Sequence, residues 1–300
     1  MKTRPPRATR PVVHALGDSA RFARRLARSL DVPFVPVRTH SFPDGETLVR
    51  VTHRAGAEAI LVQSFNDPDR KLMPALLVAD ALHRAGARRV TLVAPYLAYM
   101  RQDRIFRPGE PISQRVFGQC LVRAFDRVLT VEAHLHRTHR LGDVMASRAR
   151  SLSAAPAIAQ WLARRGGGGA VAVGPDEESE PWIRAVARAA GVRWVVGVKR
   201  RLGDRRVCVR FPELPRGARA VVIDDIASSG ATIAAAVRAL RERGVRTVDA
   251  AVVHAIFAPG ALDLIRRAGA RTVVSCDTVE HPTNRIQCAP VVSAALGSAR

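Results

Sequence analysis

The sequence predicts an α/β fold with two tandem domains, each a mainly parallel sheet flanked by helices. Short runs of β-branched and apolar residues alternate with stretches of helical periodicity, and four glycines at 166–169 interrupt that alternation. Alternating strands and helices are typical of parallel sheets, because each crossover between parallel strands needs room for a helix. We therefore expect one domain over 12–165 and another over 170–295. Similar stretches at 87–93 and 217–223 favour a relationship between the two.

In the first half, β-favouring apolar runs predict strands at 12–16, 34–37, 48–51, 59–63, 90–94 and 127–131. Apolar residues at helical spacing predict helices at 22–30, 68–86, 113–125 and 154–165. Asp67 and Pro68 combine a favoured N-cap with a favoured first helical residue, and Gly86 is a stop signal.

In the second half, the same criteria predict strands at 171–173, 194–198, 207–211, 221–223, 248–253 and 272–276. Helices are expected at about 181–190, from 233 to near 244, and at about 261–267. The segment 199–206 is a cationic, glycine-containing loop, which is typical either of an anion-binding loop or of a solvated hairpin.

The composition favours a globular cytoplasmic protein. Hydrophobic residues make up 47% of the chain, no apolar run approaches the ~20 residues of a membrane span, and no secretory signal is recognisable. The net charge of +22 invites a nucleic-acid partner, but nearly all of it comes from scattered arginines, which disfavours that reading. Scattered cysteines argue against a zinc site or a disulfide framework: Cys120, Cys208, Cys276 and Cys288.

Residues 221–233 form the most informative stretch. A strand is followed by Asp224 and Asp225 at its carboxyl end, then by a turn of small residues, then by a helix. Backbone N–H groups at a helix start have no intrahelical partner and can hold a phosphate, while the carboxylates could bind sugar hydroxyls or Mg²⁺. The alternative is an ordinary turn with a serine cap. The turn residues are Ser228, Ser229, Gly230, Ala231 and Thr232.

Other polar clusters follow predicted strands. Three arginines at 101, 104 and 107 suit a polyphosphate or a solvated turn. Histidines at 134, 136 and 139, together with Glu132, could bind a metal or be structural. Asp176 follows the strand at 171–173, and Phe42 precedes two carboxylates in a turn, where its residue type favours a core position. Ligands of parallel sheets bind at the carboxyl ends of the strands, which joins these clusters into one hypothesis.

At this point the sequence resembles a known family. Residues 224–232 resemble the phosphoribosyl pyrophosphate loop of type I phosphoribosyltransferases, a likeness that any member of that group could share. The wider order of motifs is similar to the ribose-phosphate pyrophosphokinase family over about residues 12–295. Those motifs are SFPDGE at 41–46, YMRQDR at 99–104, GEPIS at 109–113, the His134 region, GPD at 174–176 and KRR at 199–201.

The resemblance implies two type I phosphoribosyltransferase-like domains, a homo-oligomer (commonly a dimer-based hexamer), Mg²⁺, and diphosphoryl transfer from ATP to ribose 5-phosphate. It places ATP at Arg101, Gln102 and Asp103, with adenine contacted from a neighbouring subunit by Phe42, Asp44 and Glu46. It places Mg²⁺ at His134 and Asp176. Asp224 and Asp225 would hold the ribose hydroxyls, and 228–232 its phosphate. Lys199 and Arg201 would stabilise the transferring group.

The chain also departs from the family pattern. Ser228 stands where many members carry aspartate, Ala231 replaces a usual glycine, and Glu132 replaces a usual aspartate. Glu177-Glu178-Ser179 replaces a usual His-Gly-Gly run after Asp176 and adds negative charge there. A non-catalytic regulatory homologue and a type I phosphoribosyltransferase are therefore the alternatives, although a transferase of that type is usually a single domain.

Overall fold

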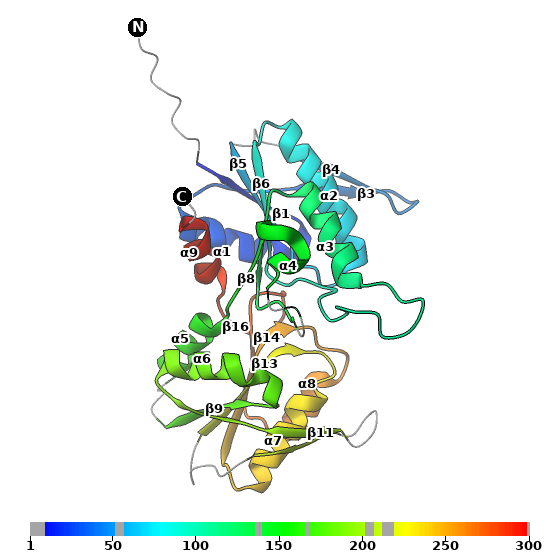
Figure 1. Cartoon of the computed structure of the whole chain (residues 1–300). Helices are drawn as coiled ribbons and strands as arrows, with labels where there is room; N and C mark the ends of the chain where they lie inside the picture. The colour runs from blue at the N-terminus through cyan, green and yellow to red at the C-terminus, as the bar shows by residue number, and fades with distance from the viewer. Residues whose placement is uncertain are drawn as a thin grey trace. The chain divides into compact units, whose positions relative to one another are not determined.

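The computed structural model describes residues 10–51, 57–135, 138, 140–165, 169–201, 207–211 and 219–298, with the backbone alone at 147, 199–201, 207 and 208. The chain forms two compact units (Figure 1). Unit 1 comprises Met1–Leu152 and Ala289–Arg300, and unit 2 comprises Ser153–Cys288. Among the described residues, no helix is both long and apolar enough to cross a membrane.

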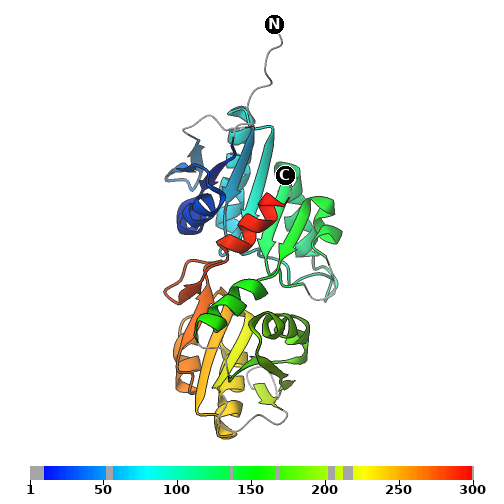
Figure 2. The ribbon, with the colours of Figure 1, turned by 90° about the vertical axis from the view of Figure 1, so that its left-hand side faces the viewer.

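Unit 1 is built on a six-stranded parallel sheet in the order β2-β1-β5-β6-β7-β8. Its strands are β1 (Val12–Ala15), β2 (Phe34–Pro36), β5 (Glu58–Val62), β6 (Arg89–Ala94), β7 (Arg127–Val131) and β8 (Ala149–Leu152). Helices α1 (Ala20–Leu30) and α9 (Ala289–Gly297) lie on one face, as Figure 2 shows. The other face carries α2 (Pro68–Arg84), α3 (Ser113–Ala124) and α4 (Gly142–Met145).

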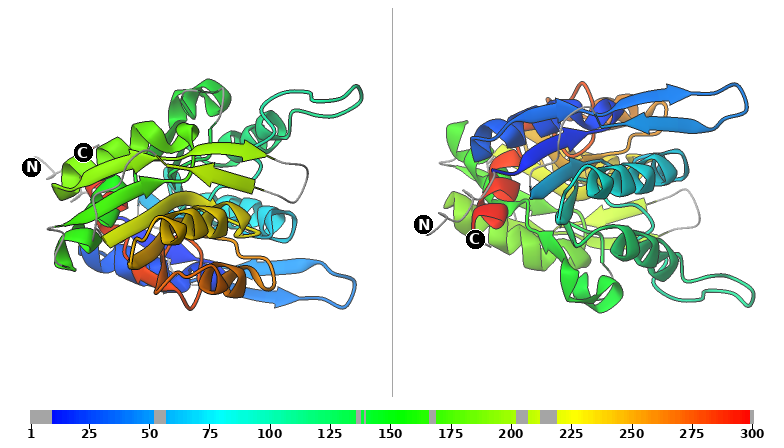
Figure 3. Two further views of the ribbon diagram at one scale, coloured as in Figure 1. Left: turned by 90° about the horizontal axis from the view of Figure 1, so that it is seen from below. Right: turned by 90° about the horizontal axis from the view of Figure 1, so that it is seen from above.

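An antiparallel hairpin, β3 (Arg38–Ser41) and β4 (Thr47–Arg50), extends away from this sheet (Figure 3). Short 3-10 turns, η1 (Gly17–Ser19) and η2 (Ala146–Arg148), precede α1 and β8.

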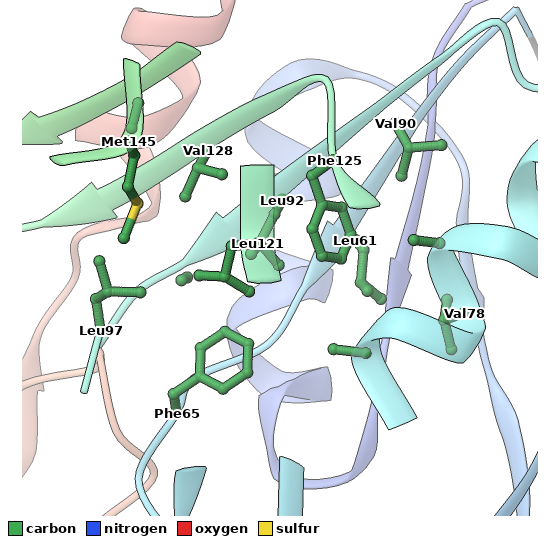
Figure 4. Packing of buried hydrophobic residues seen from close by; sticks show 14 of the residues in the cluster. Leu61, Phe65, Val78, Val90, Leu92, Leu97, Leu121, Phe125, Val128 and Met145 are labelled. Carbon is green, nitrogen blue, oxygen red and sulfur yellow. The ribbon is translucent and has the colours of Figure 1, made fainter. Parts of the chain in front are cut away.

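The core of unit 1 fills the space between the sheet and the α2–α3–α4 layer (Figure 4). Leu61 and Leu92 project from adjacent strands and meet Phe65, Leu121 and Phe125, all of them at most 1% exposed. Each such side chain contributes about 1.5–3 kcal/mol when it leaves water. This packing fixes α2 and α3 against the strands whose carboxyl ends carry the candidate ATP residues.

Unit 2 repeats the plan with a six-stranded parallel sheet in the order β10-β9-β13-β14-β15-β16. Its strands are β9 (Ala170–Gly174), β10 (Arg193–Val196), β13 (Arg219–Ala227), β14 (Thr247–Ala255), β15 (Val273–Cys276) and β16 (Asn284–Ile286). Helices α5 (Ala155–Arg164) and α6 (Glu180–Ala190) lie on one face, and α7 (Ala231–Glu242) and α8 (Ala261–Arg267) on the other (Figures 1 and 2). A 3-10 turn, η3 (Glu177–Ser179), precedes α6.

The two units share more than their class. In each, a 3-10 turn ends on a buried serine, Ser19 or Ser179, which is the N-cap of the first helix after the first strand. In each, a hairpin follows the edge strand; in unit 2 it is β11 (Val198–Arg201) with β12 (Val207–Arg210). The expected relationship between the two halves is therefore confirmed, together with the parallel α/β fold.

The division between the units differs from the expected boundary at the glycine run. Helix α5 lies before those glycines in sequence but packs on α6 and belongs to unit 2. Helix α9 returns to unit 1, where it packs on α1. An amphipathic pattern shows that a helix covers a sheet but does not say which sheet. The predicted bounds therefore assign α5 to the first domain and residues 289–295 to the second, whereas the structure has both the other way round.

Among the described helices and strands, five were not predicted: α4, β3, β8, β16 and α9. Strand β16 has three residues and β8 four, too short for a clear period. The predicted strand at 194–198 is in fact interrupted at Gly197, where β10 ends and β11 begins. A Cβ at Gly197 would lie 2.4 Å from Val209 Cγ1 and 2.8 Å from Phe211 Cε1, so only glycine lets the chain turn here.

Candidate functional site

The β13–α7 junction of unit 2 forms the predicted small-residue turn. Asp224 and Asp225 lie in the carboxyl-terminal half of β13, which continues to Ala227 and is therefore longer than the predicted strand at 221–223. Ser228 and Ser229 are exposed, Gly230 is the N-cap, and α7 begins at Ala231. The start of a twelve-residue helix thus faces a turn with two hydroxyl groups, an arrangement that suits an anionic group.

Gly230 is required by geometry. Its φ is 75°, and a Cβ there would lie 3.0 Å from the carbonyl oxygen of Ala261 and 3.1 Å from Ile265 Cδ1. The turn is also held from the neighbouring segment, because the Ala258 N–H donates to the Ser228 carbonyl at 3.0 Å. The backbone of the turn is therefore fixed before any ligand binds.

The two carboxylates lie where β13 extends past its neighbour. Strand β9 pairs with β13 only as far as Val222, whereas β14 pairs with it as far as Ala227. Because strand side chains alternate, Asp224 lies on the α7 face with Val222, and Asp225 lies on the opposite face. Both are partly exposed, and the Asp225 N–H donates to Asp224 Oδ1 at 3.1 Å. The side chains available to a sugar are thus at the carboxyl edge of the sheet.

Asp176 lies at the same edge, two residues after β9. Glu177 and Glu178 are exposed, while Ser179 is buried and donates its hydroxyl to the Asp176 carbonyl. Gly174 makes room for this hydrogen bond, since a Cβ there would lie 2.2 Å from Ser179 Oγ. The unusual run after Asp176 is therefore accommodated locally, with its two carboxylates turned toward solvent.

In unit 1, the segment after β6 carries the candidate ATP residues. Arg101 is exposed, and Gln102 and Asp103 are partly exposed. Ser113 Oγ donates to Gln102 Oε1 at 2.6 Å, which fixes the side-chain amide of Gln102 to the start of α3. Tyr99 just before them has a φ of 63°, its hydroxyl donates to Asp69 Oδ1, and its ring packs on Phe117. Such a backbone conformation costs about 1–3 kcal/mol and is held by its surroundings.

The segment after β7 carries His134. Glu132, the first residue after the strand, has a φ of 41°, and its N–H donates to the Leu152 carbonyl at 2.8 Å. The Ala133 N–H donates to Ser151 Oγ at 2.9 Å. His134 is partly exposed. It follows β7, whose carboxyl end lies next to that of its paired strand β6. His136 and His139, named with it from the sequence, lie outside the described residues.

The hairpin β3–β4 carries Phe42, Asp44 and Glu46 at its turn. The Phe42 N–H donates to the Glu46 carbonyl at 2.8 Å, and the Glu46 N–H donates to Asp44 Oδ1 at 3.0 Å. Phe42 is 39% exposed, with its ring 4.7 Å from that of His40. The expectation of a core position for Phe42 is therefore wrong, because the hairpin extends beyond the sheet.

Lys199 and Arg201 belong to β11 and pair with Val209 and Val207. The expected cationic loop thus begins as a strand, and the remainder of it, 202–206, lies outside the described residues, as do the side chains of Lys199 and Arg201.

The candidate metal residues show no ready-made centre. Within the part of the chain that the structure describes, no three His, Cys, Asp or Glu side chains gather closely enough to hold a metal ion. Mg²⁺ is commonly held by one or two carboxylates with substrate phosphates completing its shell. The carboxylates at 176, 224 and 225 are a donor set of that chemistry, so the residues fit Mg²⁺ delivered with a polyphosphate.

Comparison with known proteins covers both units. Residues 12–124 match the N-terminal domain of ribose phosphate pyrophosphokinase, and residues 148–290 match a phosphoribosyl transferase domain. The ribose-phosphate pyrophosphokinase of Methanopyrus kandleri is 35% identical over 95% of this chain and 98% of its own. That of Thermococcus kodakarensis is 30% identical over 92% and 97%. The crystal structure of phosphoribosylpyrophosphate synthetase from Mycobacterium smegmatis superposes with a TM-score of 0.82, at 26% identity, over 96% of this chain and 98% of its own. With such likeness over nearly its full length, the chain belongs to the ribose-phosphate pyrophosphokinase family.

Proposed function

We propose that the protein transfers the diphosphoryl group of ATP to the 1-hydroxyl of ribose 5-phosphate, giving phosphoribosyl pyrophosphate and AMP. A bond forms between the ribose O1 and the β-phosphorus, the bond between the β-phosphorus and the α,β-bridging oxygen breaks, and the hydroxyl proton is released. The β13–α7 junction carries this proposal, because the end of one strand brings two carboxylates next to a turn and helix start that suit a phosphate. Membership of the family in both units supports it.

In this proposal, ribose 5-phosphate binds unit 2. Its 5-phosphate lies on residues 228–232, which offer serine and threonine hydroxyls and the N–H groups of the first turn of α7. Asp224 and Asp225 accept hydrogen bonds from the ribose hydroxyls. The attacking oxygen is thereby oriented by the protein, and no protein nucleophile takes part.

We assign ATP binding to Arg101, Gln102 and Asp103, with adenine contacted by the 42–46 turn of a neighbouring subunit in a homo-oligomer, a dimer-based hexamer. His134 and Asp176 would hold Mg²⁺, which neutralises phosphate charge when bound. Lys199 and Arg201 stabilise the transferring diphosphoryl group, since this chemistry depends on positioning and charge compensation. The setting is the cytoplasm.

The test is to incubate the purified protein with Mg-ATP and ribose 5-phosphate and to follow AMP and phosphoribosyl pyrophosphate by ³¹P NMR. Both products should appear in equal amounts. Bound nucleotide without AMP would instead identify a non-catalytic homologue. A product made only from a nucleobase and phosphoribosyl pyrophosphate would identify a phosphoribosyltransferase.

Lys199→Ala supplies the mechanistic test. It should lower turnover by about two or more orders of magnitude and leave ATP affinity nearly unchanged, because its charge acts on the transition state. Steady-state kinetics and calorimetry of ATP binding separate the two effects. A variant with wild-type turnover would remove Lys199 from the mechanism.

A further inference from the structure

Gln114, the second residue of α3, is a buried polar side chain that the family motifs do not include. It is 2% exposed, and three of its hydrogen bonds reach residues outside α3. Its backbone N–H donates to the Gln102 carbonyl at 3.2 Å, and its Nε2 donates to the Met100 carbonyl at 3.3 Å. Its Oε1 accepts from Thr138 Oγ1 at 3.3 Å. Gln114 therefore uses its backbone donor, its side-chain donor and its side-chain acceptor at the same time.

These bonds join two separate segments of unit 1. Met100 and Gln102 belong to the segment after β6, which carries the candidate ATP residues, and Thr138 belongs to the segment after β7, which carries His134. Strands β6 and β7 are paired, with Ala94 opposite Thr130. The two segments thus leave adjacent strand ends, and the Gln114 amide links them.

The geometry restricts Gln102 in particular. Gln102 accepts at its backbone carbonyl from Gln114 and at Oε1 from Ser113, both at the start of α3. Both acceptors are therefore engaged by α3, which leaves the amide NH₂ as the donor that Gln102 can offer to an anion. Loss of the Gln114 amide would leave the Met100 carbonyl and the Thr138 hydroxyl without these partners, which would loosen both segments.

We propose that Gln114 is a positioning residue for Mg-ATP: it holds the Arg101–Gln102 segment in register with the segment that carries His134. The proposal rests on the proposed function, because it assumes that these segments bind ATP and its metal. It predicts that substitution weakens ATP binding and Mg²⁺ activation together while leaving ribose 5-phosphate unaffected.

The test compares Gln114→Met with Gln119→Met. Methionine keeps the length of glutamine and the backbone N–H bond to Gln102 but cannot make the two side-chain hydrogen bonds, and Gln119 is exposed on the same helix. Gln114→Met should raise the KM for Mg-ATP and the Mg²⁺ activation constant about tenfold, with the KM for ribose 5-phosphate unchanged. Gln119→Met should match the wild type. Unchanged ATP kinetics in folded Gln114→Met would overturn the proposal, because a merely structural residue would lower stability alone.

Two further measurements keep the outcome decisive. If Gln114→Met does not fold, Thr138→Val removes one of the three bonds and should raise the KM for Mg-ATP severalfold. Thr138→Ser keeps the hydroxyl and should have the wild-type KM; equal values for these two variants would refute the proposal.

Calorimetry with α,β-methylene-ATP measures affinity without turnover. If the wild type makes no AMP, the proposed function fails, yet weaker binding by Gln114→Met would still support the positioning role and equal binding would refute it.

Discussion

Asp249, a buried carboxylate near the start of β14, joins this strand to β13 and to the residues just before β15. It is 0% exposed and accepts hydrogen bonds from Arg219 of β13, at 2.9 Å, and from Arg271, at 2.7 Å. Thr272 donates to it at 2.7 Å. Burial acts most strongly and would raise the pKa of Asp249, but the hydrogen bonds from Arg271, Thr272 and Arg219 together hold that pKa below its usual value.

Asp249→Asn should lower the free energy of unfolding by about 2–3 kcal/mol, because a neutral amide replaces an acceptor of charge-assisted hydrogen bonds. Urea unfolding measures this change. Asp263→Asn is the control: its partner Arg266 is 3.7 Å away and both side chains are at least 60% exposed, so its effect should stay below about 1 kcal/mol. Equal effects of the two variants would show that burial does not determine how much an ion pair contributes to the free energy of unfolding.

His281 should make stability depend on pH near neutrality. Burial lowers the pKa of His281, and its Nδ1 accepts from the Thr283 N–H at 3.3 Å. The unfolded chain, with a pKa of about 6.5, therefore binds the proton more readily than the folded chain. Stability is unaffected above that pH and falls as the pH drops below it. Melting temperatures from pH 5 to 8 should decline less steeply on the acid side for His281→Gln; identical slopes would exclude His281.

At the scale of elements, the β13–α7 turn tests how far a backbone shape determines binding. Gly230→Ala should raise the KM for ribose 5-phosphate by at least about tenfold, because a Cβ would push against Ala261 and Ile265 as well as strain φ. Gly244→Ala is matched to it: that glycine follows the C-cap of α7, has a φ of 82°, and has no atom within 4 Å of a Cβ. It should lose about 1–2 kcal/mol of stability and keep its kinetics. Similar KM values for both variants would mean that the turn does not hold the phosphate.

The same turn shows what a sequence can predict about a site. The pattern of strand, carboxylates, small residues and helix predicted the junction, because each feature is local in the chain. It did not predict that β13 continues through Asp224 and Asp225, since pairing with β14 determines where the strand ends. Likewise Lys199 and Arg201 read as loop, but pairing with β12 makes a strand of them.

The role of Gln114, in contrast, could not be predicted from the sequence. Its sequence neighbours predicted a helix start, and a glutamine there reads as a solvated residue. Its burial and its bond to Thr138 arise from the packing of α3 under two strand ends, a contact between residues 24 apart. No local period or motif marks such a residue, so only the fold reveals it.

At the scale of the whole molecule, the parallel α/β class and the repeated plan follow from the alternation of strands and helices. Which helices belong to which unit does not follow from that alternation. Helix α9 follows unit 2 in sequence, yet Arg127 of β7 donates to its Ala295 carbonyl at 3.2 Å, and Ser293 Oγ donates to the Ser29 carbonyl of α1 at 3.1 Å. An arginine near the carboxyl end of a helix also suits the helix dipole.

Removal of residues 289–300 should therefore weaken unit 1 and leave unit 2 nearly intact. Hydrogen exchange should accelerate in α1 and β8, which contact α9, while β15 and β16, which lie closer in sequence, keep their protection. Loss of protection confined to β15 and β16 would contradict the assignment of α9 to unit 1.

The return of α9 also has a consequence for how the protein is made. Domains tend to fold as units while the chain leaves the ribosome. Unit 2 is complete once Cys288 has emerged, but unit 1, begun first, still lacks the helix that covers α1. Unit 1 is therefore translated first but completed last. The surface of α1 that α9 covers stays exposed while unit 2 is being translated.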